Sequence, residues 1–269
     1  IAVTSNDNGG GGIYLSSDGS MSIAVLNTAL NNNQIFCDFN IAPNTSTNNI
    51  GGAGLYALGN SMSVMMDGLS AKSNFITAQF SNSTSGNSNG GSGVYLLSVG
   101  PLTLAISDLE LGDNEFTGEQ AVSTSDSSNT NGGAGLYVKA TNLDVSVDSA
   151  FVYNNVVHLS EHSAASNQNG GAGLYFLANG CANIQVSKLI MNNNSIGSTR
   201  SYADLLNSNG GGGMYINSLG GNSSLLLTDS AFIGNSVHCG DSVSMLHVAG
   251  GGSLFMFAWQ DSFITIPNC

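Results

Sequence analysis

The sequence predicts an all-β solenoid of parallel strands, and three regularities lead to this fold class. A glycine cluster followed by an aliphatic residue and an aromatic recurs about every forty residues, a period typical of repeat architectures. Apolar residues between these clusters alternate with a period of two, which indicates half-buried strands and not helices. An asparagine recurs in the same register of each repeat. Together these features predict a single domain over residues 1–269.

The first strand of each repeat carries the glycine–aromatic phrase. Tyr137 lies between the apolar residues Leu136 and Val138, so its parity is opposite to theirs and we expect the aromatic column to face outward. Stacked rings would form a ladder that stabilises one face, either open or covered by a loop or glycan, or alternatively a flat strip that binds sugar rings or a neighbouring protein. The column comprises Tyr14, Tyr56, Tyr95, Tyr137, Tyr175, Tyr215 and Phe255.

The second strand holds an apolar pair at alternate positions, such as Val145 and Val147, and the third strand surrounds an asparagine. We expect these asparagines to form a structural ladder, in which stacked amides hydrogen-bond along the column. The ladder comprises Asn33, Asn74, Asn114, Asn155, Asn194 and Asn235. A second row precedes the glycines and is expected to shape the turn into the first strand; it comprises Asn8, Asn89, Asn131, Asn169 and Asn209.

Polar stretches such as Ser81–Asn89 and Ser123–Asn131 separate the third strand from the next glycine cluster. Their Ser, Asn, Thr and Gly residues form turns and have little to bury, so we expect one long polar loop per coil. The sequence thus predicts about six to seven coils of roughly forty residues, each with three strands. The first and last residues fall inside coils, which predicts a segment of a longer solenoid or a unit that stacks end to end.

The repeats resemble those of polymorphic outer-membrane proteins and autotransporter passenger domains. The GGA motif of that family matches Gly132–Ala134, and its FxxN motif matches Phe232–Asn235. The resemblance implies a right-handed parallel β-helix and specifies no activity. An extra glycine before Leu55, Leu136 and Leu174 departs from the usual spelling of the repeat.

Composition indicates the setting in which such a solenoid would act. Only 8% of the residues are charged and the net charge is −13, which disfavours binding to nucleic acid or to anionic membrane surfaces. No apolar run is long enough for a membrane-spanning helix. Four N-x-S/T sequons, at Asn44, Asn82, Asn193 and Asn222, predict a secreted, glycosylated protein at the cell surface.

The remaining reactive residue types suggest no catalytic or metal set. Cys37, Cys181, Cys239 and Cys269 form no disulfide framework, and we expect them to pack as small apolar residues. The histidines His158, His162, His238 and His247 fall in predicted loops without a carboxylate motif beside them. Lys72, Lys139, Lys188 and Arg200 are scattered, as are Asp67, Asp108, Asp148 and Asp229. We therefore expect neither a metal nor a cofactor.

These features predict a non-enzymatic structural or adhesive module of an extracellular surface or fibre protein. Its expected partners are other β-helix segments, copies of itself stacked end to end, or glycans. One alternative is a glycan-binding adhesin that uses the tyrosine strip. A second, less favoured alternative is a polysaccharide-active enzyme of the pectin-lyase type, which would need clustered carboxylates and a cation beside an anionic sugar.

Overall fold

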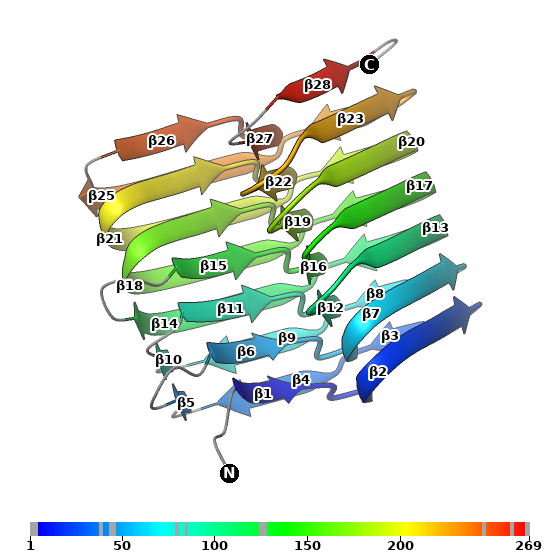
Figure 1. Cartoon of the computed structure of the whole chain (residues 1–269), viewed down its shortest axis with the longest axis horizontal. Coiled ribbons are helices and arrows are strands. Elements are labelled where there is room, and N and C mark those ends of the chain that lie inside the picture. The colour runs from blue at the N-terminus through cyan, green and yellow to red at the C-terminus, as the bar shows by residue number, and fades with distance from the viewer. Residues whose placement is uncertain are drawn as a thin grey trace.

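The protein is a stack of parallel β-strands. The computed structural model describes residues 5–37, 40–42, 47–78, 81–83, 86–123, 128–243, 246–258 and 261–266. In this part of the chain every regular element is a strand, and the strands pair in parallel within a 13-stranded and a 15-stranded sheet. Strands about forty residues apart lie above one another, giving a β-solenoid of about five turns (Figure 1). The predicted parallel solenoid is confirmed.

The 15-stranded sheet contains the glycine–aromatic phrase, the apolar pairs and the residues before the asparagine ladder. Its first group of strands begins at the glycine turn: β2 (Ile13–Leu26), β7 (Leu55–Asp67), β12 (Val94–Ser98), β16 (Leu136–Ala140), β19 (Leu174–Ala178), β22 (Met214–Ser218) and β27 (Leu254–Ala258). Its second group leads towards the ladder: β3 (Ala29–Asn31), β8 (Ser70–Lys72), β13 (Leu102–Gly112), β17 (Leu143–Tyr153), β20 (Ala182–Asn192), β23 (Ser223–Thr228), β24 (Ala231–Ile233) and β28 (Ser262–Thr265).

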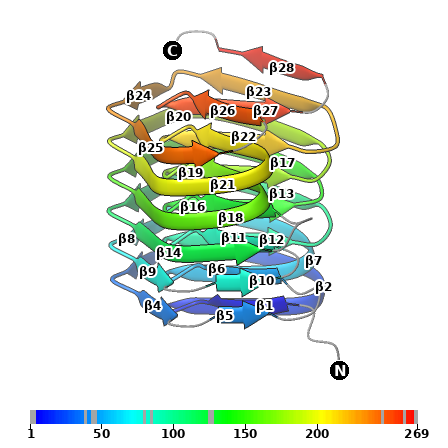
Figure 2. The same ribbon diagram turned by 90° about the vertical axis from the view of Figure 1, so that its left-hand side faces the viewer.

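The 13-stranded sheet contains the residues between the ladder and the next glycine turn. The strands that follow the ladder, with their extensions, are β4 (Gln34–Cys37), β5 (Asn40–Ala42), β9 (Phe75–Ala78), β10 (Ser81–Ser83), β14 (Glu115–Ser123), β18 (Val156–Gly170), β21 (Ser195–Gly210) and β25 (Ser236–Val243). The strands that precede the glycines are β1 (Ser5–Gly9), β6 (Thr47–Gly51), β11 (Gly86–Gly90), β15 (Ser128–Gly132) and β26 (Leu246–Gly250). Figure 2 shows these strands stacked along the axis.

The apolar pairs of the second strand face the interior, as their two-residue spacing predicts. Val145 and Val147 are 1% and 2% exposed, and the equivalent pairs of the other coils are buried with them down to Leu225 and Leu227. They pack in one continuous cluster with the residues that flank each aromatic, such as Leu136 and Val138. Burial of this apolar surface is the main favourable contribution to folding.

Sharp corners separate the faces and are made by residues in the left-handed backbone region. One corner immediately precedes each ladder asparagine and is formed by Asn32, Ser73, Asp113, Asn154, Asn193 and Gly234, with φ between 52° and 62°. These are mostly residue types whose short polar side chains tolerate this region. The corner turns the chain between the two sheets and leaves the next residue pointing inward.

The predicted long polar loop is wrong for the residues that the structure describes. The stretch Ser81–Asn89 includes β10 and most of β11, and the stretch Ser123–Asn131 includes most of β15. In-register polar residues of successive coils pair their main chains, as Asn87 does with Asn48 and Asn129. Stacking supplies these hydrogen bonds, so the strands form without an alternating apolar pattern. Some coils therefore have more strands than the three that were predicted, such as the coil from β7 to β11, whereas the coil of β16, β17 and β18 has three, the last of which runs through to the glycine turn.

Candidate functional site

The asparagine ladder is an internal support, as its register predicts. In the four inner members, Asn74, Asn114, Asn155 and Asn194, the amide Nδ2 donates to the Oδ1 of the next ladder asparagine and to a backbone carbonyl of the previous coil. For Asn114, these acceptors are Asn155 Oδ1 and the Ala71 carbonyl, both at 2.9 Å. Its own Oδ1 accepts from Nδ2 and the main-chain N–H of Asn74, at 2.9 and 3.1 Å. The buried amide is fully used, which leaves it no capacity for a ligand.

The second asparagine row forms another buried ladder. Asn89 Nδ2 donates to Asn131 Oδ1 at 3.0 Å, and Asn131 Nδ2 donates to Asn169 Oδ1 at 2.9 Å. These residues lie in strands, and the left-handed conformation expected at the turn belongs instead to the second glycine of each cluster, such as Gly133 with φ +59°. Of Asn8 and Asn209 the structure describes only the backbone.

The aromatic column is a self-stacked ladder whose inner rings are buried, so the alternative of an exposed contact strip is wrong. Tyr56, Tyr95, Tyr137, Tyr175 and Tyr215 are each 0% exposed, whereas Tyr14 at one end of the column is 47% exposed. Successive rings are parallel, with centroids 4.8 to 5.1 Å apart. They do lie outside the main core, as their parity requires, but they form a separate apolar cluster. The column is a covered stack that stabilises the coils.

The strand that precedes each glycine turn forms one wall around the rings. Tyr95 Oη donates to the Ser88 carbonyl at 3.2 Å, and Tyr137 Oη lies 2.7 Å from Thr130 Oγ1. Burial raises the pKa of Tyr137 to about 12, although its hydrogen bonds to Thr130 and Ser88 act in the opposite direction. The sequence allowed for a covering loop or glycan over the rings, and the structure shows that this cover includes strands such as β11 and β15.

The glycine cluster is explained by this close packing. A Cβ on Gly51 would lie 2.0 Å from Tyr95 Cδ2 and 2.4 Å from the Gly90 carbonyl oxygen. The first glycine of the cluster thus provides space for the tyrosine of the next coil. The glycine before the aliphatic residue, such as Gly93, faces the ladder, where a Cβ would lie 3.2 Å from Asn114 Nδ2. The glycines serve packing and turning and form no ligand loop.

Lys139 is the one cation described within this covered layer. It lies between Leu97 and Leu177 in the neighbouring coils, and its Nζ donates to Ser88 Oγ at 2.8 Å. Burial lowers the pKa of Lys139 to about 8, because the low-dielectric surroundings disfavour the charged ammonium. Within the described part of the chain its polar partner is the Ser88 hydroxyl and not a carboxylate, which is typical of a structural polar group.

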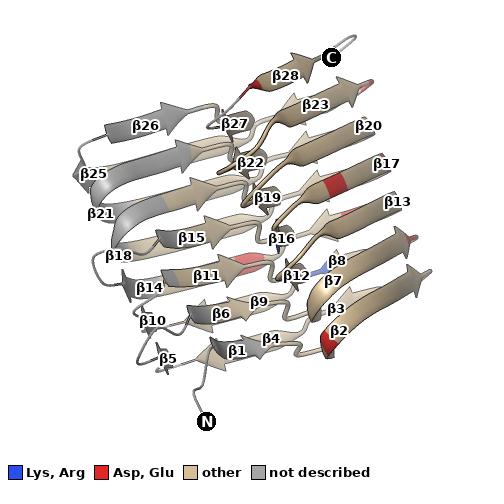
Figure 3. Ribbon diagram, viewed as in Figure 1, with Lys and Arg blue, Asp and Glu red and all other residues tan. Residues whose placement is uncertain are grey.

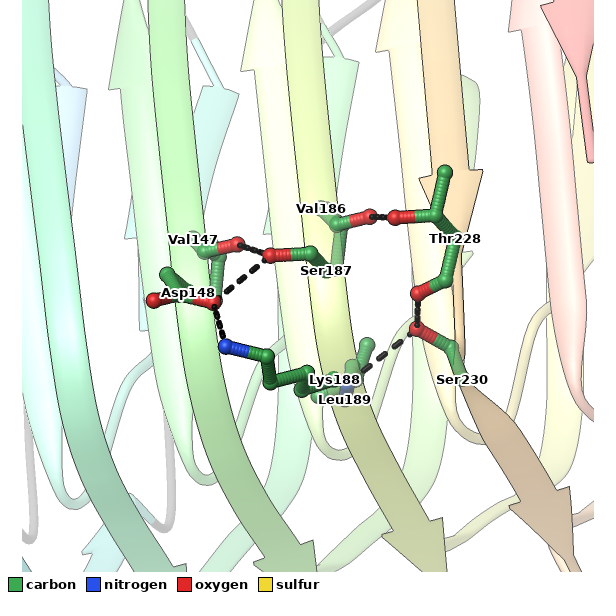
Figure 4. A network of polar contacts seen from close by, with 8 residues as sticks. All are labelled: Val147, Asp148, Val186, Ser187, Lys188, Leu189, Thr228 and Ser230. Carbon is green, nitrogen blue, oxygen red and sulfur yellow. Dashed lines mark hydrogen bonds and ion pairs between the residues drawn. The ribbon is translucent and has the colours of Figure 1, made fainter.

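The outer face of the 15-stranded sheet carries polar columns that hydrogen-bond along the axis. Figure 4 shows one of them: Ser187 Oγ donates to Asp148 Oδ1 at 2.8 Å, and Lys188 Nζ lies 3.1 Å from the same oxygen. The hydrogen bond from Ser187 and then the Lys188 cation hold the pKa of Asp148 below its ordinary value. Ser230 extends the network through Thr228. The column presents a hydrated surface whose polar groups are already paired with one another.

A second polar cluster lies on the outer side of the residues before the ladder. Lys72 Nζ lies 2.6 Å from Glu110 Oε2, and Tyr153 Oη donates to Glu110 Oε1 at 3.2 Å. The hydrogen bond to Glu110 raises the pKa of Lys72. The Tyr153 ring also stacks on Phe151, with centroids 4.6 Å apart. Because both charged groups are partly exposed, the pair contributes little to stability.

Two of the four sequons lie on the described surface. Asn193 occupies a left-handed corner and Asn222 precedes β23, and both side chains are exposed. Asn82 lies in β10, where the structure describes only its backbone, and Asn44 lies outside the described residues. Both exposed asparagines leave room for a glycan without displacing the core.

The cysteines only partly follow the prediction of buried packing. Cys37 is half-buried and packs against the apolar cluster below the 13-stranded sheet. Cys181 is a free thiol exposed at the corner before β20, so the burial expected for it is wrong. The side chain of Cys239 and the whole of Cys269 lie outside the described part of the chain.

Charged side chains are sparse along the described ribbon (Figure 3). Within the described residues, no three His, Cys, Asp or Glu side chains gather closely enough to hold a metal ion. Nor does the described part of the structure contain a helix of the length and apolarity needed to cross a membrane. Of the predicted histidines, His158 and His238 are exposed on one sheet face, and the side chains of His162 and His247 are not described.

Comparison with known proteins adds no assignment. No family model, curated protein or solved structure matches this chain.

Proposed function

We propose that this protein is a non-enzymatic extracellular module that serves a structural or adhesive role as a stiff rod. The observation that carries the proposal is the use of the two most regular columns for stacking: the asparagine amides bond to one another, and the tyrosine rings pack on one another. A periodic ligand-binding surface would instead be expected to present repeated side chains that have no role in stacking. A rod built this way resists bending because each coil is hydrogen-bonded to its neighbours along its length.

The proposed winding is right-handed, with six to seven coils of about forty residues. Successive strands of each column are parallel and are joined by the remaining faces of the coil. Crossover connections between parallel strands of one sheet are right-handed in nearly all proteins, because strand twist favours that sense. The resemblance of the repeats to those of autotransporter passenger domains supports the same hand.

End-to-end association with another β-helix, a further segment or a second copy, is the proposed mode of assembly. Core-register residues lose their cover at the last described coil: Ile264 is 50% exposed, whereas Leu225, its partner one coil below, is 2% exposed. Tyr14 is likewise uncovered at the other end of its column. A further coil of the same kind would bury these side chains and pair the edge strands.

The test is glycopeptide mass spectrometry on natively isolated protein, combined with electron microscopy of the same material. We expect glycans on the exposed residues Asn193 and Asn222, and rods longer than the described solenoid. Unmodified sequons in compact particles would contradict the extracellular rod. A screen on pectin-like and glucan polysaccharides adds an independent check, because reproducible turnover would contradict the non-enzymatic assignment.

A further inference from the structure

A groove of about 420 Å³ lies on the outer face of the 13-stranded sheet, over the strands that follow the asparagine ladder. His158 of β18 and His238 of β25 both line it, and Gly197 of β21 lies between them. The strand register pairs His158 with Gly197 and Gly197 with His238. The two exposed imidazoles therefore belong to one outward column, separated by a single coil whose residue has no side chain.

The missing side chain at Gly197 leaves the space between the imidazoles open. Nδ1 of His158 lies 3.9 Å from the position that a Cβ on Gly197 would occupy. The His158 ring thus already lies beside the glycine, and a branched side chain there would enter the space between the rings. Two strand spacings put the two histidine backbones about 9.6 Å apart. Two imidazoles that lean over the glycine can meet one ion at the usual metal–nitrogen distance of about 2.1 Å.

We propose that His158 and His238 form a two-histidine site for a divalent transition-metal ion, clamping the coils of β18, β21 and β25. Imidazole suits Cu²⁺, Ni²⁺ and Zn²⁺, and the general order of affinities places Cu²⁺ first. Water completes the coordination, so the ion stays exchangeable. The chemistry differs from that of a structural zinc site, which is closed by four protein ligands. Such an ion would link neighbouring coils of the rod without taking part in any reaction.

The experiment is calorimetric titration of the full chain with Cu²⁺, followed by Ni²⁺ and Zn²⁺, together with electron paramagnetic resonance of the Cu²⁺ form. We expect one ion per chain at this site and a spectrum with two imidazole nitrogens. Replacement of either ligand, in His158→Ala or His238→Ala, should raise the dissociation constant for the ion at least about tenfold. Gly197→Val should weaken it comparably while leaving both ligands in place.

Matched controls separate this site from general metal binding and from loss of fold. Asn183→Ala changes an exposed polar residue of the other sheet and should leave the affinity unchanged. Since both histidines are exposed, circular dichroism and thermal unfolding without metal should be the same for each histidine variant as for the parent chain. Binding that survives both histidine replacements, or a Cu²⁺ spectrum with only one imidazole nitrogen, would overturn the proposal.

Discussion

At the scale of single residues, the ladder asparagines are the side chains whose replacement should lower the stability of the fold most. Asn114→Ala would remove four side-chain hydrogen bonds and leave the Ala71 carbonyl and the Asn74 amide without their partner. We expect the free energy of unfolding to fall by about 3–5 kcal/mol, because buried groups that lose a partner bear the full cost of desolvation. Asn183→Ala, on the exposed surface, should change it by no more than about 0.5 kcal/mol. Urea denaturation measures both, and equal small effects would contradict the structural ladder.

The effect of Lys139 on the stability of the folded chain is predicted to depend on pH. Its pKa is about 8 in the folded chain, against an ordinary value of 10.5, so the unfolded state binds more protons between these pH values. This lysine therefore makes the folded state more stable as pH rises from about 8 to 10.5, and it opposes folding at pH 7. Lys139→Met should be more stable than the parent chain at pH 7 by about 1–3 kcal/mol, with the difference shrinking towards pH 10.5.

The measurement for Lys139→Met is urea denaturation of both chains at pH 7, 8, 9 and 10. Both chains contain the same other titratable residues, so the difference between the two chains isolates the lysine. A stability difference that stays constant with pH would show that burial does not depress the pKa of Lys139.

At the scale of structural elements, two tyrosines provide a matched pair within one stack. Tyr137 Oη shares a hydrogen bond with Thr130, whereas Tyr175 Oη has no hydrogen-bond partner among the described residues. Tyr137→Phe should therefore cost about 1 kcal/mol of unfolding free energy, and Tyr175→Phe should be neutral or stabilising. Thermal unfolding of the two variants tests this order, and a larger loss for Tyr175→Phe would contradict it.

The glycine turn allows a second element-scale prediction, which depends on space and not on backbone freedom. Gly51→Ala places a Cβ against the ring of Tyr95 and the carbonyl of Gly90. We expect the free energy of unfolding to fall by at least about 1–3 kcal/mol, the usual cost of overpacking, and by more if the backbone must move. Gly19→Ala is the control, since its nearest contact would be Ser17 Oγ at 3.7 Å. Comparable melting temperatures for the two variants would disprove the packing role of Gly51.

The sequence predicted the elements whose side chains alternate and missed those whose stability comes from stacking. Period-two apolar pairs such as Val145 and Val147 identified the second strand, because their burial leaves a pattern in the sequence. The strands β11 and β15 are polar, so only the stacked register reveals them. For the same reason the cover over Tyr137 was expected to be a loop or glycan, whereas it includes one of these polar strands, β15.

The column of His158 and His238 was also missed, although the sequence held the signal for it. Both histidines follow a ladder asparagine, Asn155 or Asn235, by the same number of residues, and Gly197 holds the same place after Asn194. Residues at equal offsets from the ladder fall in one column. Within its own repeat each histidine is isolated, whereas an alignment of the repeats places both histidines at the same position.

At the scale of the whole molecule, a solenoid of stacked coils should tolerate the removal of one complete repeat. Deletion of residues 115–155 joins Asn114 to Val156, the residue that pairs with Glu115 in the native register. The shortened chain should keep both ladders and lose one coil, because each repeat contacts mainly its neighbours. A deletion of residues 115–135 removes half of this repeat and shifts the ladder out of register, so that chain should not fold cooperatively.

Small-angle X-ray scattering of the chain without residues 115–155 shows whether the coils are interchangeable. A stacked solenoid predicts a folded rod whose long dimension is shorter by about 4.8 Å, one strand spacing, with an unchanged cross-section. A chain that unfolds, or that folds with an altered cross-section and an unchanged length, would contradict a solenoid built from interchangeable coils.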